Sequence, residues 1–289
     1  MRTFIKYGSD AQRLEWSQKS KEDCKSFELR TTVANEMIQS PFVIDKYNGH
    51  ASYATHHLTD LVSEVMQWSN DVISKSNLKR RWKPNKPFIK LDFVNPSKLT
   101  WDSPFIKLAT HKDIISAVSK YMGHVPILYN CGLWYSKNVP KNLASSQLFH
   151  CDWEDINNIK LFVHISNITS EDGPLIIIPA NKSKQVRLAT NYTFGPTRYY
   201  LQDKEVEQHC SKDNFIELSG QPGTLSFLDT CSCFHYGSRV KESKNRIVAV
   251  FQYLSPAAVN LMPKYRNVAP FKHLMNDELD QVNKLLVGI

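Results

Sequence analysis

The chain has 289 residues, a formal net charge of +8 and a hydrophobic content of 42%, which are ordinary values for a soluble globular protein. No stretch approaches the roughly 18 consecutive apolar residues of a membrane-spanning helix, and the polar first residues lack the apolar centre of a secretory signal. Six cysteines in a chain of this length do not form a disulfide scaffold. We therefore expect a cytoplasmic protein with reduced thiols and no membrane partner, either a monomer or a homodimer.

The positive charge favours acidic partners, such as an anionic small molecule or a nucleic acid. It is spread along the chain, and only residues 79–83 form a concentrated basic strip. A basic strip with a single aromatic residue is a poor signature of nucleic-acid binding. We therefore expect a small-molecule partner and disfavour nucleic acid.

The first part of the chain is helical or irregular. Residues 1–30 are polar with scattered apolar positions, and we expect them to wrap or cap the rest. Within residues 50–76, apolar residues at spacings of three and four predict an amphipathic helix. The basic, proline-containing segment 77–105 predicts a loop with one short strand around residues 88–93.

A second helix is predicted over residues 111–122, with Thr110 and Asp113 forming a capping box. A short helix near the C-terminus is predicted to begin at Asn276 as its N-cap. Both helices have apolar residues at helical spacing, so each is expected to bury one face.

From residue 126 onward, short β-rich runs alternate with turn residues, which is typical of a sandwich or a barrel. We expect strands near residues 127–136, 146–152, 159–166, 174–179, 197–201, 214–218, 223–229, 233–239 and 246–254. No convincing boundary divides the chain. We expect a single domain over residues 1–289, comprising a helical and loop region (1–125), a β core (126–255) and a helical tail (256–289).

A histidine and a carboxylate lie one residue apart at His150 and Asp152. In an extended strand, side chains alternate between the two faces, so these two project to the same side, while Cys151 points away. The pair can therefore hold two neighbouring positions on one metal ion. Alone, such a pair is a weak signal, because it occurs by chance in many proteins.

We expect the third ligand to be His235, because the small pair Gly237 and Ser238 shortly after it leaves room beside it. Two histidines and one carboxylate leave open positions on an octahedral ion, which suits iron(II) and its co-substrates. Zinc would prefer a fourth protein ligand or one tightly held water. The sequence therefore predicts His150, Asp152 and His235 as an iron(II) site.

Arg246 opens a β-rich run eleven residues after His235. By alternation it shares an inward face with Val248, Val250 and Gln252. A buried guanidinium is costly without a partner, and a bound carboxylate would supply one in bidentate geometry. We therefore expect Arg246 to bind the carboxylate of a ligand.

This order of His-x-Asp, distal histidine and arginine resembles the iron(II)/2-oxoglutarate oxygenases of the phytanoyl-CoA dioxygenase superfamily. Three further stretches carry the resemblance: residues 160–167, the Asp-Gly-Pro turn and strand over 171–179, and the run 222–230 before His235. The resemblance spans about residues 127–255. It implies a mainly β fold with added helices, namely a double-stranded β-helix (jelly roll, cupin-like).

The resemblance also implies roles and a reaction. Arg246 would bind the far carboxylate of 2-oxoglutarate, and Ser238 or Tyr236 would assist, because the family's small polar residue two places after the distal histidine is here Gly237. The implied enzyme is a 2-oxoglutarate-dependent dioxygenase that hydroxylates or otherwise oxidises a small molecule, converting 2-oxoglutarate and O2 to succinate and CO2. Related halogenases lack the carboxylate ligand, so Asp152 implies oxidation and not halogenation.

Further residues are candidates for lining the substrate pocket, with core packing or solvent exposure as the alternative for each. They are Trp134, Tyr135 and Gln147 before His150, Trp153 and Lys160 after it, and Arg239 after His235. Lid segments are expected within residues 40–57, 84–108, 136–147 and 183–212. Cys231 and Cys233 lack a second cysteine pair at zinc spacing and are interpreted as buried thiols.

Two alternatives stay open. The net charge and the basic strip are compatible with oxygenation of a nucleic acid or a protein side chain. The second alternative is a non-catalytic jelly-roll protein that binds a metal or a ligand. The presence of all three candidate metal ligands together with Arg246 counts against this alternative.

Overall fold

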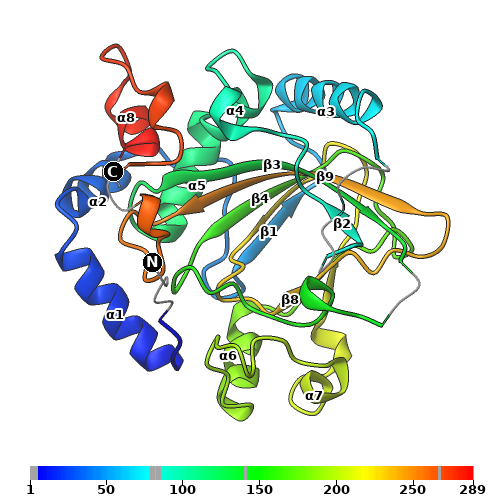
Figure 1. Ribbon diagram of the computed structural model, residues 1–289. Coiled ribbons are helices and arrows are strands. Elements are labelled where there is room, and N and C mark those ends of the chain that lie inside the picture. The colour runs from blue at the N-terminus through cyan, green and yellow to red at the C-terminus, as the bar shows by residue number, and fades with distance from the viewer. Residues whose placement is uncertain (1–5, 79–81, 83–85, 140–141, 266–267, 289) are drawn as a thin grey trace.

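The computed structural model describes residues 6–78, 82, 86–139, 142–265 and 268–288, and within them two antiparallel sheets lie face to face (Figure 1). The larger sheet contains, in spatial order, β1 (His50–Tyr53), β7 (Leu225–Leu228), β4 (Ile159–His164), β9 (Asn245–Leu254), β3 (Ile127–Lys137) and β2 (Ile89–Lys90). The smaller sheet contains β6 (Ile216–Leu218), β5 (Leu175–Ile177) and β8 (His235–Tyr236).

The alternation of side chains divides the larger sheet into two faces. On β4, Leu161 and Val163 join the main hydrophobic core, whereas Phe162 joins a second cluster that contains Ile177 and Leu218 of the smaller sheet. β9 follows the same rule, with Val248 and Val250 on the inner side and Ala249, Phe251 and Tyr253 on the outer side. The space between the sheets is therefore lined by the even-numbered residues of β4 and β9.

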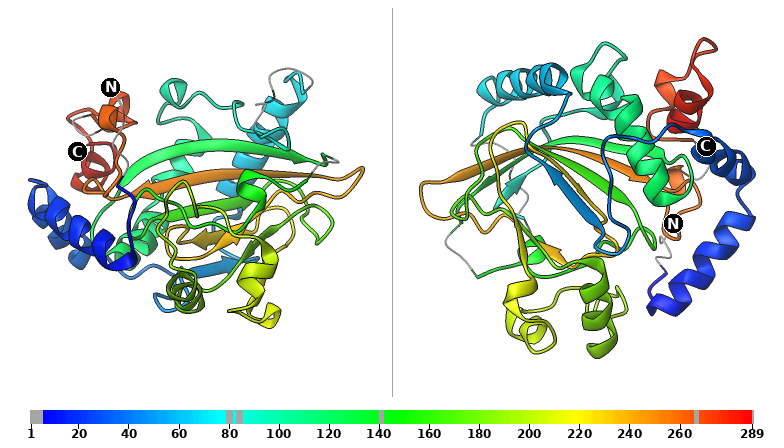
Figure 2. Two further views of the ribbon diagram at one scale, coloured as in Figure 1. Left: turned by 60° about the horizontal axis from the view of Figure 1, so that its bottom comes forward. Right: turned by 180° about the vertical axis from the view of Figure 1, so that it is seen from behind.

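Helices cover the outer face of the larger sheet. These are α3 (Thr59–Ser74), α4 (Pro104–Ala109) and α5 (Lys112–Met122) (Figure 1). At one end of the sheets lie α1 (Asp10–Glu22), α2 (Phe27–Glu36) and α8 (Gln281–Val287), while α6 (Ala180–Ala189) and α7 (Asp203–Glu207) lie beside the smaller sheet (Figure 2). Residues of α3–α5 pack with outer-face residues of the larger sheet in one hydrophobic core. This core supports the strands whose inner side chains line the space between the sheets.

Several elements differ from the sequence-based expectations. Residues 50–53 form β1, paired with β7, before the expected helix starts at Thr59. Residues 6–30 contain all of α1, which begins with a capping box between Ser9 and Gln12, and only the first residues of α2. The first part of the chain therefore contributes strands to the sheet as well as a covering layer.

Both predicted helix caps are wrong by a few residues. The N-cap of α5 is His111, whose ring accepts a hydrogen bond from the amide of Asp113, so Thr110 takes no part. The N-cap of α8 is Asp280, and Asn276 instead caps a local turn by accepting from the amide of Glu278. In each case a polar residue nearer the helix provides the acceptor.

Two expected strands are replaced by isolated bridges. Residues 146–152 consist of a short 3-10 turn (Ser145–Gln147) followed by single bridges from Phe149 to Leu201 and from His150 to His235. Residues 197–201 form bends that end at the first of these bridges. The expected lid segment 183–212 contains most of α6 and all of α7.

The observed architecture is thus mixed α/β with two antiparallel sheets, and within the described residues no ladder joins the two sheets. The isolated bridges pair Phe149 with Leu201 and His150 with His235 of β8. The double-stranded β-helix stays a prediction. Among the described residues, no helix combines the length and apolar composition needed to cross a bilayer. The basic residues Lys79–Arg81 and Lys83 of the strip lie outside the described residues.

Candidate metal centre and its cavity

Backbone pairing brings the three predicted metal ligands together between the sheets. The amide of His150 donates to the carbonyl of His235 at 3.1 Å, and the amide of His235 donates back at 2.9 Å. The amide of Asp152 donates to the carbonyl of Thr230 at 2.7 Å. These bonds fix two segments that are distant in the sequence side by side, just where β8 begins.

The ligand atoms converge on one point. One donor atom from each of His150, Asp152 and His235 lies within 4.8 Å of the others, and all three residues are buried. Asp152 Oδ1 lies 3.9 Å from Nε2 of His150 and 4.0 Å from Nε2 of His235. Within the described residues this is the only such group of three or more potential ligands.

Both imidazole rings are oriented for metal binding. Nδ1 of His150 lies 2.9 Å from the carbonyl of Leu148, and Nδ1 of His235 lies 3.0 Å from the carbonyl of Cys233. A carbonyl only accepts, so each Nδ1 carries the proton and each Nε2 lone pair faces the centre. Burial, and next the adjacent His235, lower the pKa of His150 to about 3, which keeps the ring neutral as a ligand must be.

Lys160 holds the carboxylate ligand. Its ammonium group donates to Oδ2 of Asp152 at 2.5 Å, which leaves Oδ1 facing the histidines. Burial alone would raise the pKa of Asp152, but the Lys160 charge and the two rings outweigh it and hold that pKa below its usual range. Asp152 is thus an ionised candidate ligand, with Oδ2 bonded to Lys160 and Oδ1 directed at the two histidines.

Arg246 is buried in the same cavity without an acidic partner among the described residues. Nη2 donates to Oγ of Ser238 at 3.0 Å, and Nε has no hydrogen-bond partner. Burial lowers the pKa of Arg246 to about 10. A guanidinium so placed favours a ligand carboxylate, because the ligand would supply the missing charge and acceptors.

The residues around Arg246 explain why the chain has glycine at position 237. A Cβ atom there would lie 3.2 Å from Nη1 of Arg246, so a side chain would crowd the guanidinium. Ser238 takes a left-handed conformation with φ of 63° and reaches Arg246 from the next position. Its hydroxyl also lies 2.9 Å from Oγ of Ser136, and its carbonyl accepts from Gln147.

The cavity has a volume of about 310 Å3, which is at the small end of ligand pockets. Of the predicted lining residues, Trp134, Trp153, Lys160 and Ser238 border it together with Arg246 and the three metal ligands. Sequence reasoning did not select its other lining residues, which are Lys86, Ile89, Leu91, Ser146, Glu154, Phe162, Leu175, Tyr199, Tyr200, Thr230 and Gly237. Glu154 and Phe162 could have been found from the sequence, since they lie two residues from the predicted site residues Asp152 and Lys160.

Four of the predicted site residues do not line the cavity: Tyr135, Gln147, Tyr236 and Arg239. Tyr135 points to the opposite side of β3 from Trp134 and packs edge-on to Trp82. Gln147 is a structural donor to Ser238. Tyr236 packs against Phe149 and under the guanidinium of Arg239, which lies 3.4 Å from the ring centroid.

Arg239 has a structural partner outside the cavity. Its guanidinium donates to both carboxylate oxygens of Asp203 at 2.6 and 2.7 Å, and Nε donates to the carbonyl of Gln147. This contact ties α7 to the segment between β8 and β9. Arg239 is therefore paired with an acidic residue of the protein, whereas Arg246 has no acidic partner among the described residues.

Three of the four expected lid segments reach the cavity. Ile89 and Leu91 come from segment 84–108, Ser146 from 136–147, and Tyr199 and Tyr200 from 183–212. The two tyrosine rings lie 5.6 and 5.5 Å from the ring of His150, so they border the metal ligands. None of the lining residues comes from segment 40–57, which instead supplies the edge strand β1.

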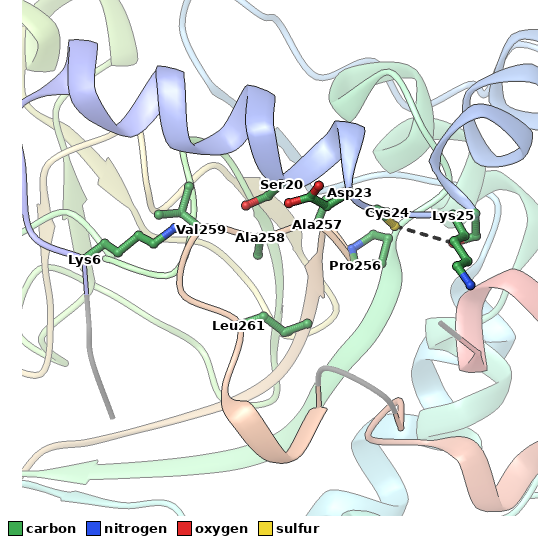
Figure 3. Close-up of a pocket in the computed structure, with 11 residues that line it drawn as sticks. Lys6, Ser20, Asp23, Cys24, Lys25, Pro256, Ala257, Ala258, Val259 and Leu261 are labelled. Atoms are coloured by element: carbon green, nitrogen blue, oxygen red, sulfur yellow. Dashed lines mark hydrogen bonds between the residues drawn. The ribbon is translucent and has the colours of Figure 1, made fainter. Parts of the chain in front are cut away.

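A second hollow of about 740 Å3 lies between the end of α1 and the segment after β9 (Figure 3). Its walls combine Lys6, Asp23 and Lys25 with small apolar residues such as Ala257 and Ala258. The three metal-ligand candidates are not among its lining residues. The smaller cavity is therefore the candidate functional site although it is not the largest hollow.

Solved structures of similar fold include several non-haem iron proteins. SnoN, a non-heme alpha ketoglutarate dependent epimerase from nogalamycin biosynthesis, matches with a TM-score of 0.53 and 13% identity over 73% of this chain and 80% of that chain. EctD from S. alaskensis matches with a TM-score of 0.51 and 15% identity over 76% of this chain and 82% of that chain. At such identities the likeness establishes the fold alone.

Those proteins have been solved with ligands bound. SnoN is known in complex with Fe3+, alpha ketoglutarate and nogalamycin RO, and EctD with 2-oxoglutarate and 5-hydroxyectoine. No protein-family model matches this chain. No curated protein sequence matches it either.

Proposed function

We propose that this chain is an iron(II)- and 2-oxoglutarate-dependent oxygenase that acts on a small molecule. The observation that carries the proposal is the coexistence, in one buried cavity, of a two-histidine, one-carboxylate group and an arginine without an acidic partner. The ligated structures of SnoN and EctD support it, because similar folds hold iron and 2-oxoglutarate.

The residues present fit both groups. His150, Asp152 and His235 would hold iron(II), a donor set that leaves positions open for co-substrates. Arg246 would bind the far carboxylate of 2-oxoglutarate, assisted by the Ser238 hydroxyl. When bound, the iron and 2-oxoglutarate supply the oxidation, with O2 consumed and succinate and CO2 released.

The chain's own residues then control the reaction in three ways. Lys160 keeps Asp152 ionised and turned toward the histidines. The carbonyls of Leu148 and Cys233 fix the tautomers of His150 and His235. The rings of Trp134, Trp153, Tyr199 and Tyr200 line the cavity and restrict water around the substrate.

The finer assignments rest on the sequence motifs. The order and spacing of the ligands and Arg246 support membership of the phytanoyl-CoA dioxygenase superfamily and a jelly-roll core. The carboxylate of Asp152 fills the position that halogenases leave free, which supports hydroxylation or another oxidation. The six free cysteines support a reducing compartment such as the cytoplasm.

The test is turnover of 2-oxoglutarate by the iron-loaded protein. We expect succinate to form when Fe(II), 2-oxoglutarate and O2 are all present, even without a substrate, and to disappear in Asp152→Ala. Full succinate formation by a correctly folded Asp152→Ala variant, or none by the iron-loaded wild type across a broad panel of small molecules, would contradict the proposal.

A further inference from the structure

One acidic side chain of the cavity has no role in holding iron or 2-oxoglutarate. Glu154 follows Asp152 by two residues and lines the same cavity. Its Oε2 atom is shielded from solvent and has no hydrogen-bond donor among the described residues. Its backbone carbonyl accepts from the amide of Asn260 at 2.8 Å, so the position of the residue is fixed.

The other charged groups of the cavity have partners or an assigned ligand. Lys160 donates to Asp152 at 2.5 Å. Arg246 is assigned to the carboxylate of 2-oxoglutarate, and Lys86 has interactions of its own. The side chain of Gln252 on β9 interacts with Glu154, but no hydrogen bond of normal geometry joins its Nε2 to Oε2 of Glu154. A buried acceptor left in this state costs free energy unless a ligand supplies the donor.

Aromatic rings line the same cavity as this acid. Trp153 precedes Glu154, and Trp134, Tyr199 and Tyr200 line the same cavity. The faces of such rings attract cations, most strongly when water is excluded. A carboxylate acceptor among aromatic rings is a setting that favours a positively charged nitrogen which also donates hydrogen bonds.

We propose that Glu154 is a substrate-binding residue and that the substrate carries a protonated amine or amidinium that donates to Glu154 Oε2. The inference rests on the proposed function, because it assigns Arg246 to 2-oxoglutarate. It differs from the expectation drawn from the net charge of +8, which favours an anionic ligand. The whole-chain charge describes the surface, whereas in this cavity the two acids Asp152 and Glu154 share the charge of Lys160 once Arg246 is assigned to 2-oxoglutarate.

The test uses anaerobic calorimetric titrations of the protein loaded with Fe(II) and 2-oxoglutarate. The probes are benzylamine, which is protonated at neutral pH, and benzyl alcohol, which has the same shape and no charge. The expected result is at least roughly tenfold tighter binding of benzylamine, and loss of that preference in Glu154→Gln. The matched control is Glu171→Gln, an exposed acid paired with Lys241, which should keep the wild-type preference.

Iron content and 2-oxoglutarate affinity are measured on every sample before the probes are added. Wild-type protein that fails to bind iron or 2-oxoglutarate would overturn the proposed function itself. Wild-type protein that binds both but shows no preference for the amine, or a Glu154→Gln variant that keeps the preference, would overturn this inference alone. Should Glu154→Gln fold poorly, the wild-type comparison of the two probes decides.

Discussion

At the scale of single residues, the two arginines after His235 show how burial and pairing separate a ligand-binding group from a structural one. Arg239 donates to both oxygens of Asp203, so its charge is already balanced. Arg246 is buried and, among the described residues, donates to the uncharged Ser238 hydroxyl and has no acidic partner. The alternation along β9 predicted that Arg246 faces inward, but the sequence could not show that Arg239 is already paired.

This difference predicts that the two arginines affect co-substrate binding unequally. Arg246→Gln should weaken 2-oxoglutarate binding by roughly 10- to 150-fold, since a charge-assisted contact contributes about 1.5–3 kcal/mol. Arg239→Gln, the matched control, should leave that affinity within about twofold. Anaerobic titration of 2-oxoglutarate into the iron-loaded proteins measures both. Equal losses in the two variants would contradict the assignment of Arg246.

A second residue-scale prediction concerns Lys160. Lys160→Met should destabilise the metal-free protein by about 3–5 kcal/mol, because Asp152 would be left buried without its cation. Fe(II) should restore part of that loss, since the ion supplies positive charge to the same carboxylate. The control is Lys212→Met, whose pair with Glu207 is exposed and contributes little. Denaturant unfolding with and without Fe(II) checks the prediction, and an unchanged stability would refute it.

At the scale of elements, the long strands were predictable and the connections were not. β3, β4 and β9 were expected within a few residues of their observed bounds, because each is rich in apolar residues and packs on both faces. The segment of the metal ligands was expected to be a strand, yet it pairs through single bridges at Phe149 and His150. Local propensity does not reveal that a segment pairs at only one or two positions.

The residues of the candidate site also divide into those that the sequence indicates and those that it does not. His150, Asp152, His235 and Arg246 were selected from their order and spacing in the sequence, and all four line one cavity of the structure. Tyr199 and Tyr200 lie in bends after an unpredicted helix, α6, and no periodic signal marks them. Residues that line a cavity from irregular segments depend on tertiary packing, which the sequence alone does not display.

One buried acid links a helix to the turn before β8. Asp229 is fully buried and accepts from the hydroxyl of Tyr121 on α5 at 2.8 Å and from the amides of Asn158, Cys231 and Ser232. The turn that it organises includes Thr230, whose carbonyl receives the amide of Asp152. The metal centre is thus supported from the helical layer through a single carboxylate.

Tyr121→Phe tests this support. The change removes one donor to a buried carboxylate and should cost about 1–3 kcal/mol of stability. Tyr47→Phe, at a tyrosine that is 69% exposed, should change stability by less than about 0.5 kcal/mol. Thermal and denaturant unfolding of both variants provides the measurement. A loss no larger in Tyr121→Phe than in the control would show that the hydrogen bond contributes nothing net.

At the scale of the whole molecule, the N-terminal helix and the segment after β9 are anchored on the loop that follows the metal ligands. Arg13 of α1 donates to the backbone carbonyls of Trp153 and Asp155. Asn260 donates to the carbonyl of Trp153, and the amide of Val259 donates to the Asp155 carboxylate. The N-terminal helix and the segment after β9 therefore brace the cavity that the central strands create.

This anchoring predicts a pH dependence. Burial raises the pKa of Asp155 to about 7, so the folded state favours its protonated form. The folded state then binds more protons than the unfolded state between about pH 4 and pH 7, and this stabilising contribution is lost as the pH rises through that window. Asp155→Asn should remove the contribution, so the difference in Tm between wild type and variant should change across pH 4 to 8. A constant difference would contradict the prediction.

The central claim is that one cavity holds iron through His150, Asp152 and His235 and holds 2-oxoglutarate through Arg246. An anaerobic titration that follows iron content and 2-oxoglutarate binding together tests it most directly. We predict stoichiometric Fe(II) in the wild type, 2-oxoglutarate binding that depends on that iron, and loss of both in Asp152→Ala. Equal iron and 2-oxoglutarate binding by wild type and a folded Asp152→Ala variant, or binding of neither by the wild type, would contradict the account.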